Sequence, residues 1–384
     1  MHEGSLVVVG ALAALALTSG WLWNRYVLMG VQYERVFGQT RAFPGETVDI
    51  SVRVTNRKLL PLPWLEIGDE FPSRLPLTKG KLEVTSVSTI GLLSHLVALR
   101  WYERVSWHHQ IKAEARGYYA FGPLTLKSGD MFGFFVSEQH RPEQSFLIVY
   151  PRVVPLERLG LPSKQPFGEV RAIQRLFEDP SRTMGIRDYQ RGDGFKRIHW
   201  KATARRQQLQ VRVYEPTATP QLAVFLNTTT FEHFWQGTNV SILESAITVA
   251  ASLARYALEE GYATGLFANA PIVQGDQVIR VRPSRSPQQL TAILEALAKL
   301  NPFALLNVED VIERELPRLP WGATVVVVTA VITQGLVATL RRLPQAGRPV
   351  VLVTLGDNVD GADLQGIVAH TIRGEQLLQA LSHS

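Results

Sequence analysis

The sequence predicts a multidomain protein: an N-terminal transmembrane helix leads into an antiparallel β-sandwich, and an α/β domain follows. Three observations predict this order. Residues 4–23 carry no charge and are numerous enough to form a helix that crosses a bilayer. Short segments that alternate polar with apolar residues continue to residue 151. From residue 221 onward, strand-like and helix-like segments alternate.

The composition limits the class of protein. The chain has 384 residues, of which 46% are hydrophobic and 19% charged, so it can bury more than one core. It has no cysteine, which excludes disulfides, thiolate metal sites and a cysteine nucleophile. The formal net charge of +6 is enough to attract phosphates or anionic lipid, but it is far from the charge of a polybasic binder.

The apolar segment at residues 4–23 predicts an uncleaved membrane anchor. A secretory signal peptide requires Lys or Arg before its apolar segment, but none precedes this one. No clear cleavage site follows the segment before Trp21. Arg25, Arg35 and Arg41 lie beyond the segment, so the positive-inside rule places the residues after Arg25 in the cytoplasm. We therefore expect a single-pass protein of the cell membrane. The alternative interpretation of residues 4–23 is a buried helix of a soluble domain. It is disfavoured because the segment is apolar on every face of the helix.

Residues 27–151 predict an antiparallel β-sandwich of immunoglobulin-like size. Residues 47–55 alternate apolar with polar side chains between turn residues, which is typical of a half-buried strand. Proline and glycine residues separate further segments of this kind. These segments are 81–88, 92–102, 107–115 and 146–150.

Two features of this region have alternative interpretations. His108 and His109 suggest a metal site, but neighbouring residues on a strand point to opposite faces and cannot bind one ion together. The apolar residues of 59–65 stand in what we expect to be a proline-marked loop. They form either the closed end of the sandwich or an apolar lip that binds a partner.

Residues 152–220 form a connector in which the charge of the chain is concentrated. Residues 171–215 include eleven basic and five acidic residues, so their excess of six equals that of the whole chain. The remainder of the chain is therefore neutral on balance, and the electrostatic character of the protein is local.

Three interpretations of the basic residues stay open. Residues 171–212 bind the phosphates of RNA or anionic lipid, or they dock an acidic partner protein. In the third interpretation Arg187, Asp193 and Arg197 form an internal ion-pair network that locks the connector. No recognised nucleic-acid fold surrounds the segment, which disfavours nucleic acid as a partner.

Residues 221–384 predict an α/β domain with a mainly parallel sheet that is covered on both faces. The expected strands are 222–226, 262–268, 324–329 and 349–355. The expected helices are 241–260, 287–300, 333–343 and a terminal helix at 375–381.

The connector also carries a distinctive motif: an Arg, a Tyr two residues later, Gly-Asp, then Arg-x-x-Trp-Lys and Ala-Arg. The residues at these positions are Arg187, Tyr189, Gly192, Asp193, Arg197, Trp200, Lys201, Ala204 and Arg205. The motif resembles the signature of the bacterial domain-of-unknown-function 58 family, and the flanking sequence is similar over nearly the full chain. These residues are therefore our candidates for partner binding or for a structural role.

The resemblance implies a membrane-anchored β-domain followed by a von Willebrand factor type A-like domain, with a MoxR-type AAA+ ATPase as partner. In such a domain the first strand precedes a magnesium motif, Asp-x-Ser-x-Ser, and later loops add a Thr and an Asp. In this chain Asn227, Thr229 and Phe231 fall on the motif, and the loop at 329–330 lacks the acid. Because Mg²⁺ requires carboxylate ligands, we expect no metal at the degenerate positions Asn227 and Thr229.

The sequence lacks the common catalytic motifs, including the phosphate-binding P-loop, the nucleophile elbow and the dinucleotide fingerprint. A triad of Ser181, His199 and Asp193 has nothing in the sequence to set its geometry. We therefore expect no enzyme activity and no cofactor. The leading hypothesis is a membrane-anchored scaffold or adaptor that docks proteins and works with a MoxR-type ATPase in assembly or activation of other proteins. The alternative is an RNA- or anionic-lipid-phosphate-binding protein that uses residues 171–212.

Overall fold

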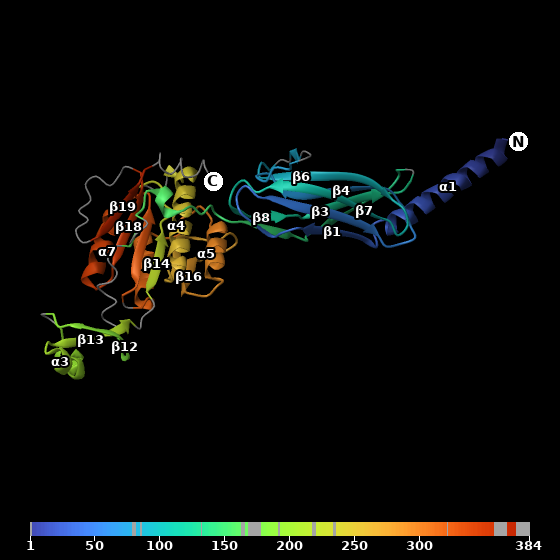
Figure 1. The fold of residues 1–384 in the computed structure, drawn as a ribbon. Helices are drawn as coiled ribbons and strands as arrows, with labels where there is room; N and C mark the ends of the chain where they lie inside the picture. Colours follow the sequence, from blue (N-terminus) through green and yellow to red (C-terminus); the bar gives the residue numbers. More distant parts are fainter. Residues whose placement is uncertain are drawn as a thin grey trace. The chain divides into compact units, whose positions relative to one another are not determined.

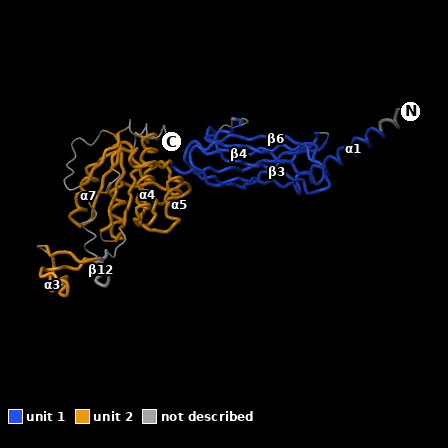
Figure 2. Tube along the Cα trace, viewed as in Figure 1, with its two compact units in different colours: residues 1–151 blue, residues 152–384 orange. Residues whose placement is uncertain are grey.

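The chain divides into two compact units, residues 1–151 and residues 152–384 (Figure 2). The first unit contains a long N-terminal helix and three β-sheets, and the second contains a six-stranded α/β sheet and a two-stranded hairpin (Figure 1). The computed structural model describes residues 2–78, 82–84, 87–131, 133–162, 166–167, 178–190, 193–216, 220–232, 236–320, 322–356 and 367–373.

Helix α1 (His2–Tyr26) is long and apolar enough to cross a membrane. Only 6% of its apolar segment is buried within the protein, and Val7, Leu12 and Leu15 are exposed. An exposed helix that is apolar on all faces is typical of a membrane span or a signal sequence. The N-terminal apolar helix predicted from the sequence is thus present, and its membrane topology stays a prediction.

The first unit is built from mostly antiparallel sheets. One sheet contains β1 (Val31–Phe37), β3 (Thr47–Asn56) and β7 (Arg104–Lys112). The second has the order β10 (Val136–Arg141), β9 (Leu124–Gly129), β4 (Leu62–Pro72), β6 (Ile90–Leu99) and β5 (Glu83–Val84). The third contains β2 (Arg41–Ala42), β11 (Ser145–Val149) and β8 (Gly117–Phe121), and in it β2 pairs parallel with β11.

The sheets of the first unit share a core because alternate residues of each strand point inward. Val48, Ile50 and Val52 of β3 are fully buried and pack in one cluster with Phe71 of β4 and Phe121 of β8. The alternation predicted for residues 47–55 is therefore observed in β3. The core of a sandwich accordingly lies between the sheets.

Several sequence expectations for this unit were wrong in detail. Among its described residues, the segment expected at 81–88 forms a strand only at Glu83–Val84, and the one expected at 107–115 ends as a strand at Lys112. The segment expected at 92–102 ends as a strand at Leu99, because residues 101–102 form a turn in which Tyr102 has a positive φ. Residues 59–65 are only partly a loop, since β4 begins at Leu62. Pro63 is tolerated there because it lies at the start of the strand, where the register is irregular.

The sheet of the second unit is parallel except at one edge, where β16 runs antiparallel to β15. Its order is β16 (Val278–Ser284), β15 (Ala263–Pro271), β14 (Gln221–Leu226), β17 (Thr324–Thr329), β18 (Val350–Leu355) and β19 (Val368–Ile372). The helices are α4 (Val240–Glu259), α5 (Gln289–Ala298), α6 (Val308–Glu315) and α7 (Gln334–Gln345). The described residues of this unit also include the short 3₁₀ helices η1 (Leu156–Leu159) and η4 (Leu316–Arg318).

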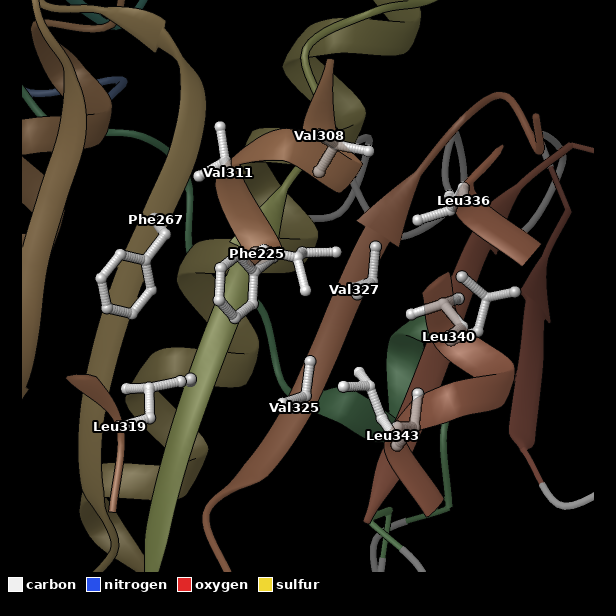
Figure 3. Packing of buried hydrophobic residues seen from close by; sticks show 14 of the residues in the cluster. Phe225, Phe267, Val308, Val311, Leu319, Val325, Val327, Leu336, Leu340 and Leu343 are labelled. Carbon is white, nitrogen blue, oxygen red and sulfur yellow. The ribbon is translucent and has the colours of Figure 1, made fainter. Parts of the chain in front are cut away.

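Apolar side chains of four neighbouring strands, β15, β14, β17 and β18, pack against α6 and α7 (Figure 3). Phe225 and Phe267 stack with ring centroids 4.9 Å apart, and Leu336, Leu340 and Leu343 approach from α7. Helix α4 matches a membrane span in length and composition, but 61% of it is buried, so it is a core helix of this domain.

The alternation of strands and helices predicted for this domain is observed, and the strand expected at 324–329 coincides with β17. Strands β16 and β19 and helix α6 were missed: β16 is only half-buried, β19 is mostly exposed, and α6 has eight residues. The helix expected at 375–381 lies outside the described residues.

Candidate functional site

The motif residues of the connector lie on a hairpin that carries a short helix between its strands. Strand β12 (Glu178–Asp188) pairs antiparallel with β13 (Gln210–Pro216), and η2 (Phe195–Arg197) and α3 (Trp200–Arg206) lie between them in the chain. The start of α3 is tied to β13, because the backbone N–H of His199 donates to the carbonyl of Gln210 at 2.8 Å. His199 Nδ1 accepts from the N–H of Ala202 and so caps the helix.

A two-point ion pair between Arg187 and Asp193 closes the hairpin. Nη1 and Nη2 of Arg187 donate to the two carboxylate oxygens of Asp193, each at 2.7 Å. The N–H of Gln190 donates to the same carboxylate at 2.9 Å. Hydrogen bonds from Arg187 and Gln190, with the nearby charge of Arg197, lower the pKa of Asp193 below its ordinary value. The charged form of this pair is the one that holds the turn.

The inner side of the hairpin carries a residue that sequence reasoning missed. Gln210 is buried, its side-chain Nε2 donates to Asp188 at 2.5 Å, and its N–H donates to Thr203 Oγ1 at 3.0 Å. Nothing in the sequence distinguishes Gln210 from Gln207 and Gln208, since its role depends on which strand residue faces α3.

The segment between the two strands of the hairpin exposes aromatic and basic side chains. Phe195 is 77% exposed and Trp200 is 67% exposed. Lys201 and Arg205 are exposed and four residues apart on α3, so they lie on one stripe of the helix. We call Phe195, Trp200, Lys201 and Arg205 the signature surface.

The structure therefore separates the motif residues into two groups. Arg187 and Asp193 bind each other, with Arg197 close enough to affect the pKa of Asp193, whereas Trp200, Lys201 and Arg205 face solvent. Tyr189 is half-buried, and its N–H donates to the carbonyl of Leu209. Gly192 lies outside the described residues.

A second group of candidate residues lies at the carboxyl ends of β14, β15 and β17. Asn227 Nδ2 donates to Thr329 Oγ1 at 3.0 Å, and Asn269 Nδ2 donates to Asn227 Oδ1 at 3.0 Å. Asn269 Oδ1 accepts from both the N–H and the hydroxyl of Thr228, at 2.8 and 2.9 Å. The side chains of Asn227, Asn269, Thr228 and Thr329 are buried. We call these four residues the strand-end network.

The side-chain oxygen atoms of Asn227 and Thr329, which a cation would need as ligands, are engaged in hydrogen bonds within the protein. Asn227 Oδ1 accepts from Asn269 and from the N–H of Thr229, and Thr329 Oγ1 donates to the carbonyl of Val331 at 2.6 Å. No carboxylate belongs to the network, and over the described ranges no three His, Cys, Asp or Glu side chains gather in a metal-binding group. This donor set does not fit Mg²⁺, which takes hard oxygen ligands with negative charge.

Sequence reasoning did not identify Asn269 as a member of the strand-end network, because it is a single polar residue in a mostly apolar segment whose pattern predicts a strand. Two of the three residues considered as a triad have other partners, since Asp193 binds Arg187 and His199 caps α3. A cleft of about 900 Å³ beside β16 is lined by Ile279, Arg280 and Leu306 among others, and it contains none of the candidate residues.

These features define a protein in which a helix of membrane-spanning length, a β-sandwich and an α/β domain with a basic hairpin follow one another. Residues 185–367 match a family model described as protein of unknown function DUF58. Over these residues the chain matches the family that its motif resembles, so the resemblance is confirmed there.

A relative is the uncharacterized protein YeaD of Bacillus subtilis strain 168, which is 23% identical over 259 residues. The match covers 66% of this chain and 61% of YeaD, so the chain spans less than two thirds of that protein's length.

Likeness to solved structures is weak. The CARDB domain of PF1109 from Pyrococcus furiosus has a TM-score of 0.22 at 11% identity, covering 31% of this chain and 91% of that domain. Native alpha-2-macroglobulin from Escherichia coli has a TM-score of 0.23 at 18% identity, covering 32% of this chain and 17% of that protein.

Proposed function

We propose that the chain is a membrane-anchored scaffold that docks a partner protein on its signature surface and performs no chemistry of its own. The observation that carries the proposal is the exposure of Phe195 and Trp200 beside Lys201 and Arg205, on a hairpin closed by an ion pair. From the family resemblance, the partner we propose is a MoxR-type AAA+ ATPase, acting in assembly or activation of other proteins.

An exposed Trp is unfavourable for a protein that has no use for it. Leaving a large apolar side chain in water forgoes about 2 kcal/mol of burial free energy. Trp and Arg are enriched among the residues that dominate binding energies at protein interfaces. The bonds from Arg187 to Asp193 hold the turn before binding, which lowers the entropy lost when a partner docks.

The charge of the surface selects the partner. Lys201 and Arg205 on α3 are followed by the exposed Arg206, and Arg212 is exposed on β13. A partner that buries Trp200 must therefore present acidic side chains around an apolar pocket.

We propose that the α/β domain is a von Willebrand factor type A-like domain that works without a metal ion. The strand-end network engages the side chains of Asn227 and Thr329 in bonds to other protein groups. We propose that this domain supports the hairpin, while α1 holds the chain at the cell membrane and the residues after Arg25 lie in the cytoplasm.

Co-purification from native membranes tests the proposal. Full-length protein is captured after crosslinking, and partners are identified by mass spectrometry, for the unaltered chain and for the double variant Phe195→Ala, Trp200→Ala. We expect the double variant to lose an ATPase that the unaltered chain retains. The matched control is Phe303→Ala, which removes an equally exposed aromatic side chain from the α/β domain.

A second arm tests the phosphate-binding alternative. If the signature surface docks protein, RNA should bind weakly, and Lys201→Glu should leave the binding of anionic vesicles unchanged. Tight RNA or vesicle binding that fades steeply with salt and is lost in Lys201→Glu would overturn the scaffold proposal, because phosphate binding is driven by counterion release.

A further inference from the structure

The end of the sandwich where α1 joins it carries a group of exposed apolar side chains. They come from the segment after α1 and from the β3–β4, β6–β7 and β9–β10 loops. All are between 58% and 72% exposed. We call this group the apolar end surface; its residues are Met29, Leu59, Trp101, Tyr102, Met131 and Phe134.

Hydrogen bonds join two of these loops to each other and to the end of α1. Lys58 Nζ donates to the carbonyls of Val27 and Met29, each at 2.6 Å. Asn56 Nδ2 donates to the carbonyls of Leu60 and Arg100, both at 2.9 Å, and so connects the β3–β4 and β6–β7 loops. These loops therefore have a set position relative to the end of the helix.

The third loop contacts α1 itself. A side chain at Gly20 would meet the ring of Phe135 at 3.4 Å, and Ser137 Oγ donates to the carbonyl of Asn24 at 3.1 Å. Trp23 and Val27 pack into the core cluster formed by β4 and β9. The last turns of the apolar helix are thus part of the sandwich.

These contacts determine the depth of the loops if α1 spans a bilayer. The apolar segment Val7–Tyr26 has 20 residues, which at 1.5 Å each span about the 30 Å of a hydrocarbon core. Gly20 and Asn24 lie in the last turns of that segment, so the loops that touch them lie at the level of the membrane interface. Trp and Tyr side chains are favoured at this depth.

The charges beside the apolar end surface fit the same environment. Arg57, Arg100 and Arg104 are exposed on the same loops and strand ends, and Arg25 lies in the last turn of α1. Basic residues next to a membrane span are attracted to the anionic lipids of the cytoplasmic leaflet.

We propose that the apolar end surface is inserted into the interface of the lipid bilayer, with its arginines on anionic headgroups. The sandwich is then held against the membrane at several points rather than tethered by one flexible linker. This inference rests on the membrane anchoring proposed above and adds the surface by which the first unit contacts lipid.

The absence of cysteine makes the test direct. The single-thiol variants Leu59→Cys and Phe134→Cys probe the surface, and Phe43→Cys is the control. Phe43 precedes β3, whose ten residues place it about 30 Å from the Asn56 end of that strand. Each full-length variant is labelled with an environment-sensitive fluorophore and reconstituted in nanodiscs of phosphatidylcholine and phosphatidylglycerol with brominated acyl chains.

We expect fluorescence at positions 59 and 134 to be quenched several-fold more strongly than at position 43. Equal, weak quenching at all three positions in a chain that remains in the nanodisc overturns the inference and leaves the anchor intact. A chain that elutes without lipid overturns the anchor and this inference together. Equal melting temperatures of the three labelled proteins serve as the folding control.

Discussion

The imidazole rings of His95 and His109 meet between two sheets of the sandwich, with their Nε2 atoms 3.2 Å apart. His95 lies on β6 opposite the buried Ile67, and His109 lies on β7 opposite the buried Ile50, so both rings point inward. His108 is exposed, as the alternation of a strand requires. At this distance one Nε2 donates and the other accepts, an arrangement that two neutral imidazoles in opposite tautomers can form.

The first prediction is that stability falls with acid because of this pair. Burial, aided by His109, lowers the pKa of His95 from 6.5 to about 4. Between these two pH values His95 is protonated in the unfolded chain but not in the folded chain. The free energy of unfolding therefore decreases as the pH falls from 6.5 toward 4. Urea unfolding across this range should show a smaller loss in His95→Gln. His108→Gln is the control and should retain the slope of the unaltered protein.

The second prediction concerns the strand-end network. Asn269→Ala removes the partner of Thr228 and of Asn227 Oδ1 inside the protein, and we expect a loss of about 2–4 kcal/mol in the free energy of unfolding. Asn307→Ala, at an exposed position without a capping bond, should cost less than about 0.5 kcal/mol. Equal losses in chemical denaturation would show that the network contributes nothing.

The third prediction is that restoring a carboxylate does not create a magnesium site. Asn227→Asp loses the donor to Thr329, and we expect it to cost about 1–3 kcal/mol of stability. Millimolar MgCl₂ should leave the melting temperature of the variant and of the unaltered protein unchanged. A rise in the variant would contradict this prediction, and a rise in the unaltered protein would contradict the metal-independent domain proposed above.

The fourth prediction concerns a buried ion pair of the sandwich. Arg35 donates to Asp69 at 2.8 Å, both side chains are at most 3% exposed, and Tyr33 binds the same carboxylate. Arg35→Met leaves this carboxylate buried without its cation and should cost about 3–5 kcal/mol. Adding Asp69→Leu should recover part of the loss. Arg53→Met, which removes an exposed arginine 3.9 Å from Glu34, should change stability by less than about 0.5 kcal/mol.

The fifth prediction separates the lock from the docking patch within the motif. Asp193→Asn should speed hydrogen exchange of the β12–β13 amides, with a change of less than about 1 kcal/mol in global stability because the pair is partly exposed. Trp200→Ala should leave exchange unchanged while partner capture falls. If Trp200→Ala also accelerates exchange, the indole supports the hairpin and its effect on binding is indirect.

Local patterns in the sequence were sufficient for the parts of the fold that depend on periodicity. Alternation in residues 47–55 predicted β3, and the uncharged apolar segment at the N-terminus predicted α1. Each prediction depends only on which side chains of a single helix or strand face an apolar environment. Residues 324–329 were predicted as a strand for the same reason. Elements missed in the α/β domain are β16, β19 and α6, which are short or largely exposed, so their patterns are weak.

The sequence by itself also determined the absence of thiol chemistry, the concentration of positive charge in one segment and the loss of acidic residues near Asn227. Only the tertiary structure decided which polar groups are partners. His95 meets His109 from another sheet, Asn269 meets Asn227 from a neighbouring strand, and the loops around Leu59 and Phe134 are brought to the end of α1. Such contacts join residues of different strands and loops, and they depend on the order in which the strands lie in the sheets, which the periodicity along one strand does not specify.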